Sequence, residues 1–118
     1  MAYTVFDALR AGFRRVVIVT RPPLRAPLEA RLGKQLGAGL PLDWVYQDVA
    51  AVPEAHASKA TARAKPWGTG QAVVACGEYL PGAFGIANGD DWYGPEALTA
   101  LADALSSLSP APPCRGVV

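Results

Sequence analysis

The chain predicts an α/β domain built on a parallel sheet, and three features of its sequence support this class. Short apolar, β-branched runs alternate with longer segments whose apolar residues recur at three- and four-residue steps. Glycine or proline marks most junctions between these segments. The chain has 118 residues, 51% of them hydrophobic, which is enough for one packed domain. In such a domain, ligands bind at the carboxyl ends of the strands.

The first half predicts two helix–strand pairs. A helix is expected over 2–13, where apolar residues recur along one face. That face consists of Tyr3, Phe6, Leu9 and Phe13. The β-branched run Val16–Thr20, ended by two prolines, is typical of a short buried strand. A leucine at every fourth position predicts a helix over 25–36, and alternating apolar residues predict a strand over 42–47.

The second half begins with a stretch that has no clear period. We expect residues 48–66 to form a long loop with a helical turn near 54–62. Beyond this loop, the pattern predicts a helix over 69–79, a strand over 83–88 and a helix over 95–108, which begins on a proline.

The end of the chain has a different composition. Segment 109–118 contains three prolines and shows no hydrophobic period. Such a segment is expected to be disordered or loosely attached. The α/β domain would then span 1–108.

Composition also bears on partners and compartment. The formal net charge is +1, which argues against a nucleic-acid partner held by a basic surface. No apolar run is long enough to span a bilayer and no signal peptide is evident, so we expect no membrane partner and a cytoplasmic location. Cys76 and Cys114 are too few for a disulfide framework, and Cys76 is expected to be a buried, inert thiol. The single histidine, His56, is expected to face solvent.

The segment Lys65–Ala72 is the first of two motifs that carry chemical information. It combines a glycine-rich loop with the start of a helix, and its central residues are Pro66, Trp67, Gly68, Thr69, Gly70 and Gln71. Glycine lets a flat ring approach the backbone closely and offers its amide and carbonyl for hydrogen bonds. The motif is not a phosphate-binding P-loop, because no Gly-Lys-Ser/Thr follows. A plain turn into a helix is the alternative.

The second motif places two carboxylates after the predicted strand 83–88. Asp90 and Asp91 follow Asn88 and Gly89. Magnesium takes hard oxygen ligands, commonly one or two from the protein and the rest from phosphates and water. A carboxylate at the end of a strand is well placed for this, so Asp90 and Asp91 are the candidate Mg²⁺ ligands. The alternative is a turn, which Asn-Gly and Asp-Asp both favour.

Taken in order, these motifs resemble the nucleotide-binding half of the sugar-phosphate nucleotidyltransferases, the family of glucose-1-phosphate uridylyl- and thymidylyltransferases. The resemblance covers roughly 2–107. It implies a three-layer, Rossmann-like sheet of the GT-A type. Residues 66–72 correspond to the loop that surrounds the nucleobase, and Gly89-Asp90 with Tyr93-Gly94 to the acid that binds magnesium. The implied substrates are a nucleoside triphosphate and a sugar 1-phosphate.

The chain departs from this family pattern at both ends. The first strand with its Gly-x-Gly-Thr/Ser-Arg loop and the later lysine are missing, and so is the sugar-binding half. We therefore expect an internal fragment with weak activity or none. In the family-like order, the missing strand would lie between 16–20 and 83–88. We expect those two strands either to pair directly or to leave the isolated chain unstable, with exposed strand edges open to self-association.

Two other functions remain open from the sequence. A non-catalytic module could use the Gly68–Gln71 loop to bind a nucleotide or a partner. A glycosyltransferase that consumes nucleotide-sugars would need an Asp-x-Asp spacing, which Asp90-Asp91 lacks.

Overall fold

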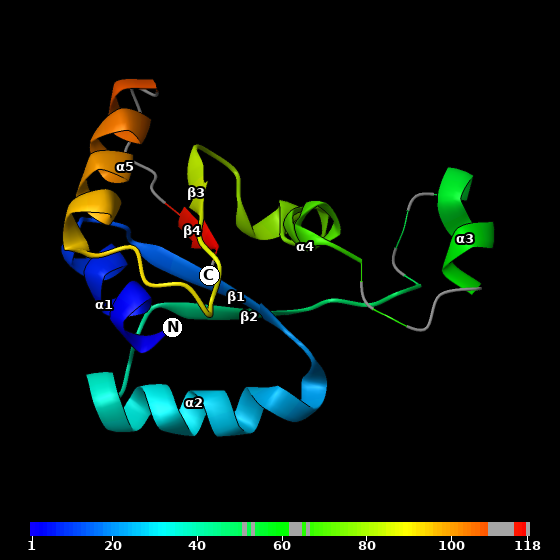
Figure 1. Ribbon diagram of the computed structural model, residues 1–118, viewed down its shortest axis with the longest axis horizontal. Coiled ribbons are helices and arrows are strands. Elements are labelled where there is room, and N and C mark those ends of the chain that lie inside the picture. The colour runs from blue at the N-terminus through cyan, green and yellow to red at the C-terminus, as the bar shows by residue number, and fades with distance from the viewer. Residues whose placement is uncertain (51, 53, 62–64, 66, 109–114, 118) are drawn as a thin grey trace.

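The computed structural model describes residues 1–50, 52, 54–61, 65, 67–108 and 115–117, and these form an α/β domain around a parallel sheet (Figure 1). The sheet has four strands: β1 (Arg15–Thr20), β2 (Leu42–Tyr46), β3 (Phe84–Ile86) and β4 (Arg115–Val117). Their spatial order is β2-β1-β4-β3, and every neighbouring pair is parallel.

Helices cover both faces of the sheet. On one face lie α1 (Ala2–Arg10), α2 (Pro22–Leu36) and α5 (Pro95–Leu108), and on the other lie α4 (Thr69–Ala75) and the 3₁₀ turn η2 (Gly77–Tyr79). A further pair, η1 (Glu54–His56) and α3 (Ala57–Thr61), projects away from the sheet at one end of the molecule (Figure 1). No helix in the described part of the chain has the length and apolar character needed to cross a bilayer.

Strand β1 supplies the centre of the core on both faces. Val16 and Ile18 join the larger apolar cluster beneath α1, α2 and α5. Val17 joins the smaller one, together with Val45 and Cys76 beneath α4. Val16, Val17 and Ile18 have no exposed surface, as the alternating side chains of a strand covered on both faces require.

Much of the predicted order of elements is confirmed. The strands at 16–20 and 42–47, the helical turn near 54–62 and the helix from Pro95 all occur, with boundaries shifted by a residue or two. Two helix ends differ more. Helix α2 begins at Pro22 rather than near 25, because proline fits the first turn of a helix, where its missing amide is not needed. Helix α4 ends at Ala75, and η2 follows it.

The predicted apolar face of the first helix is wrong for Tyr3 and Phe6, whereas Leu9 packs against the core. Tyr3 is 75% exposed and Phe6 is 45% exposed. The buried residues of α1 are instead Thr4, Val5, Asp7 and Ala8. The helix stops before Gly12, whose φ of +95° suits glycine and ends the helix, so Phe13 is buried from the loop rather than from α1. Small side chains on the inner face allow α1 to pack against α5.

The strand order excludes direct pairing of the strands at 16–20 and 83–88, which was one of the two expected outcomes. β4 lies between them, with Val16 opposite Gly116 and Gly116 opposite Gly85. Residues 115–117 therefore differ from the expected disordered or loosely attached tail, whereas 109–114 and 118 lie outside the described residues.

Gly85 in β3 allows α5 to pack directly on the strand. A Cβ atom at this position would overlap Leu101 Cδ2 and would lie 3.2 Å from Leu101 Cγ. Gly85→Ala should therefore displace Leu101 and destabilise the fold by about 1–3 kcal/mol, measured by urea unfolding. Gly33→Ala, inside α2, is the matched control, because a Cβ atom there would meet no atom within 4 Å. The control should stabilise the protein by about 0.5–1 kcal/mol. Equal effects at the two glycines would contradict this packing.

Candidate functional site

A crevice of about 350 Å³ opens at the carboxyl edge of the sheet. From β1 the chain crosses to β2 on one side, whereas β3 lies on the other side of β1, so the strand order reverses here. Ligands of open parallel sheets bind at such a reversal point. The crevice is lined by the ends of three strands and the start of α4, and the residues are Val19, Gln47, Trp67, Gly68, Thr69, Ala72, Val73, Ile86, Ala87, Asn88 and Gly89.

The glycine-rich loop is held in place by the segment that follows β2. Gln47 Nε2 donates hydrogen bonds to the carbonyls of Trp67 at 2.6 Å and Gly68 at 3.4 Å. In return, Trp67 Nε1 donates to the carbonyl of Val49 at 2.9 Å, and Gln71 Nε2 donates to that of Asp48 at 3.2 Å. These side-chain bonds fix the loop against the carboxyl end of the sheet.

Gly68 is the N-cap residue of α4. Its carbonyl accepts the amides of Gln71 at 3.1 Å and Ala72 at 3.4 Å. Its φ of −72° is accessible to any residue, and a Cβ atom there would meet nothing within 4 Å. Neither backbone conformation nor packing within the described structure therefore requires glycine at this position. Open space beside a backbone that lines a crevice suits the close approach of a ligand.

The turn that contains Asp90 and Asp91 lies on the side of the crevice opposite the glycine-rich loop. Asp91 Oδ2 accepts hydrogen bonds from Asn88 Nδ2 at 2.8 Å and from the Tyr93 hydroxyl at 3.2 Å. The Tyr93 hydroxyl in turn accepts the amide of Asn88 at 3.0 Å. Thr4 Oγ1 donates to the carbonyl of Asp91 at 3.4 Å, which attaches the turn to α1. Asp91 therefore helps to form a turn, which was the alternative to metal binding for this residue.

The structure brings only part of the predicted site together. Trp67, Gly68 and Thr69 share the crevice with Asn88 and Gly89. By contrast, the predicted metal ligands Asp90 and Asp91 line an adjoining hollow of about 530 Å³, whose other lining residues are Met1, Tyr3, Thr4 and Trp92. The candidate acid is therefore one residue beyond the crevice rather than among the residues that line it.

The remaining predicted loop residues lie outside the crevice lining. Gly70 is exposed on α4, and the Gln71 amide bonds to Asp48. Pro66 falls outside the described residues. Gln47 is the residue that sequence reasoning missed. The available signal was its position as a polar side chain at the carboxyl end of the predicted strand 42–47.

The donors near the crevice fit magnesium better than a metal that needs a full protein cage. The described residues contain no group of three or more His, Cys, Asp or Glu side chains that could hold a metal ion. Magnesium needs only one or two protein carboxylates. Asp90 is exposed in the turn that follows β3, whereas the carboxylate of Asp91 is already engaged by Asn88 and Tyr93.

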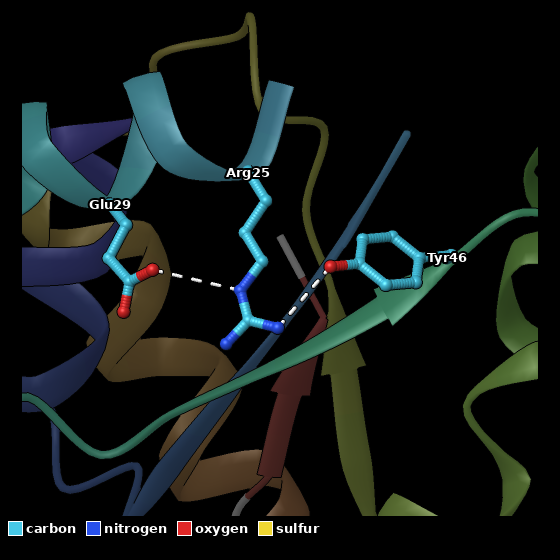
Figure 2. Close-up of polar contacts among 3 residues, drawn as sticks. All are labelled: Arg25, Glu29 and Tyr46. Carbon is cyan, nitrogen blue, oxygen red and sulfur yellow. Dashed lines mark hydrogen bonds and ion pairs between the residues drawn. The ribbon is translucent and has the colours of Figure 1, made fainter. Parts of the chain in front are cut away.

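Arg25 joins the start of α2 to the end of β2 near this edge of the sheet. Figure 2 shows its guanidinium between Glu29 on the same helix and the Tyr46 hydroxyl. Nη1 lies 3.3 Å from the Tyr46 hydroxyl oxygen, Nε lies 3.6 Å from Glu29, and the group stacks 5.8 Å from the Trp44 ring centroid. The hydrogen bond to Tyr46 is the main cause that raises the pKa of Arg25 above its usual value. We assign these contacts a structural role.

Two residues set aside in the sequence analysis have the expected environments. His56 is exposed in η1. Cys76 is fully buried beneath the sheet, and burial raises the pKa of its thiol, which disfavours the reactive thiolate. Cys114 falls outside the described residues.

Comparison with known proteins gives no independent assignment. No protein-family model matches the chain, and no curated protein matches it in sequence.

Gln47→Met should loosen the glycine-rich loop, because it removes the amide that bonds to the carbonyls of Trp67 and Gly68. We expect faster amide hydrogen exchange over 67–72 and a loss of about 1–2 kcal/mol in the free energy of unfolding. Gln35→Met is the control, since Gln35 is exposed on α2. Unchanged exchange over 67–72 in the Gln47 variant would show that the loop is held by other contacts.

Proposed function

We propose that the crevice binds the nucleobase of a nucleoside triphosphate and that the chain is a fragment of a sugar-phosphate nucleotidyltransferase. In the parent reaction, a phosphate oxygen of a sugar 1-phosphate attacks the α-phosphorus. The bond from the α-phosphorus to its bridging oxygen breaks, and pyrophosphate leaves. The observation that carries this proposal is the shared crevice: the Gly68 loop and the Asn88–Gly89 turn line one hollow at the reversal point of the strand order.

The composition of the crevice supports a base rather than a phosphate group as its occupant. None of the described residues that line it carries a charge. Val19, Val73 and Ile86 offer apolar walls, while Gln47 and Asn88 contribute amide groups. Small-molecule sites are concave, largely apolar hollows with a few polar groups, typically of 300–1,000 Å³. A hollow of about 350 Å³ is at the small end of that range and suits a single flat ring.

Asp90 is the proposed ligand of Mg²⁺, beside the crevice rather than inside it. A base seated against Gly68 would place its sugar and phosphates outside the uncharged hollow, and Asp90 lies one residue beyond the lining residue Gly89. When bound, the cation would neutralise charge on the phosphates. The role of Asp90 would be to hold that cation at the edge of the sheet.

We expect the isolated chain to have low nucleotidyltransferase activity. Phosphoryl transfer depends on positioned charge around the phosphates, and loss of one preorganised donor in an active site can cost on the order of a hundredfold in rate. The family's triphosphate-binding loop has no counterpart in this sequence. We therefore expect nucleotide binding to be easier to detect than turnover.

Gly68→Leu provides the sharpest test of the crevice. A Cβ atom at this position would meet no described atom within 4 Å, and Gly68 lines the crevice, so we expect the larger side chain to obstruct it while the fold is kept. We expect at least about a tenfold rise in the nucleotide Kd in isothermal titration calorimetry, equivalent to about 1.4 kcal/mol. Leucine is a poorer N-cap than glycine, so the melting temperature should fall slightly, and circular dichroism should show that the fold is retained. Gly70→Leu is the matched control, because a Cβ at Gly70 also meets nothing within 4 Å and Gly70 does not line the crevice.

Asp90→Asn tests whether Asp90 holds Mg²⁺. It also distinguishes a nucleotidyltransferase from a non-catalytic nucleotide-binding module. If Asp90 holds Mg²⁺, the cation should tighten nucleotide binding in the native chain but not in this variant. Asp103→Asn, on the exposed side of α5, is the charge-matched control. Binding that Gly68→Leu weakens but that does not respond to Mg²⁺ would favour a non-catalytic nucleotide-binding module. No nucleotide binding by the native chain would overturn both functions.

A further inference from the structure

Two amide side chains line the crevice, and the hydrogen bonds that each makes within the protein fix its orientation. Gln47 follows β2 and Asn88 follows β3, which are the outer strands of the described sheet. Gln47 Nε2 donates to the carbonyls of Trp67 and Gly68. A carbonyl oxygen can only accept a hydrogen bond, so the nitrogen of this amide must face the glycine-rich loop. The amide oxygen of Gln47 is therefore the end that remains available to a ligand.

The hydrogen bonds of Asn88 orient its amide in the same way. Asn88 Nδ2 donates to Oδ2 of Asp91 at 2.8 Å, and a carboxylate can only accept. The backbone amide of Asn88 is also used, because it donates to the Tyr93 hydroxyl. Within the described part of the chain, no hydrogen bond reaches Gln47 Oε1 or Asn88 Oδ1. Both side chains have thus used their nitrogen as a donor and keep an oxygen that can accept.

The other side chains that line the crevice add little that can donate. Trp67 Nε1 is occupied by the carbonyl of Val49, and the Thr69 hydroxyl can either donate or accept. The remaining lining residues are apolar or glycine. A ring that enters the crevice and displaces water therefore meets two side-chain oxygens that need a donor. An acceptor that loses water and gains no new partner costs free energy, so these oxygens favour a ring that carries N–H groups.

We propose that the crevice prefers a nucleobase with an exocyclic amino group, as in cytosine or guanine, to a base without one. This preference rests on the proposed function, since it concerns the base of the nucleotide bound there. An amino group provides two N–H donors and no carbonyl, so it can satisfy the oxygen of Gln47 or Asn88. The corresponding carbonyl of uracil or thymine is an acceptor and would face another acceptor. Uracil and thymine are the bases that the sequence resemblance suggests, so the lining of the crevice favours a different nucleotide.

Two matched pairs of nucleotides test the preference in the native chain. CTP carries an amino group where UTP has a carbonyl, and GTP carries one that ITP lacks. In isothermal titration calorimetry with Mg²⁺, we expect the amino-bearing member of each pair that binds to have a Kd about three- to tenfold lower. Equal affinities, or tighter binding of UTP or ITP, would overturn the preference and leave the proposed nucleotide binding intact. No binding of any of the four nucleotides would overturn both.

Gln47→Lys tests whether the oxygen of Gln47 contributes to the preference. The lysine ammonium can still donate to the carbonyls of Trp67 and Gly68, but it offers no acceptor. The preference within each pair should therefore disappear, and the added charge does not affect this comparison because both members carry the same triphosphate. Gln35→Lys adds the same charge at an exposed position of α2 and should keep the preference. A preference that is unchanged in Gln47→Lys would refute the role of this oxygen, and the native pairs decide the preference itself even if the variant does not fold.

Discussion

The structure depends on the burial of β1 between two layers of helices. Val16, Val17 and Ile18 have no exposed surface, and their alternating directions connect the cluster beneath α1, α2 and α5 with the cluster beneath α4. A strand buried on both faces also needs neighbours on both edges, because unpaired amides and carbonyls are costly away from water. Strand β2 pairs along one edge of β1 from Val16 to Thr20, and β4 meets part of the need on the other edge.

The short length of β4 limits the stability that its pairing can add to the sheet. A backbone hydrogen bond adds roughly 0.5–1.5 kcal/mol of net stability, so a three-residue strand with two neighbours contributes only a few kcal/mol. That amount is a large part of the 5–15 kcal/mol that stabilises a typical domain. Loss of β4 pairing should therefore weaken the whole sheet.

Sequence reasoning identified the elements that depend on local pattern and failed where tertiary packing decides. The β-branched run at 16–20 and the proline-led helix α5 were predictable, because each carries a strong period and a clear boundary signal. The inner face of α1 was not, because the close approach of α5 selects Val5 and Ala8 over the larger Tyr3 and Phe6. Strand β4 was missed because three residues after a proline-rich segment show no period, and only the space between β1 and β3 explains their position.

The candidate site likewise has parts that the local sequence pattern predicts and parts that tertiary structure decides. Gly68 and Asn88 were predictable as neighbours, because both follow from the rule that parallel strands bring their carboxyl ends to one edge. The separate position of Asp90 depends on the turn that Asn88, Asp91 and Tyr93 form together, and a linear sequence does not reveal which of two adjacent aspartates that turn engages. The turn occupies Asp91 and leaves the carboxylate of Asp90 exposed beside an uncharged crevice. The proposed nucleotide site therefore divides its roles: the uncharged crevice would take the ring, and the exposed carboxylate of Asp90 beside it would take the charge.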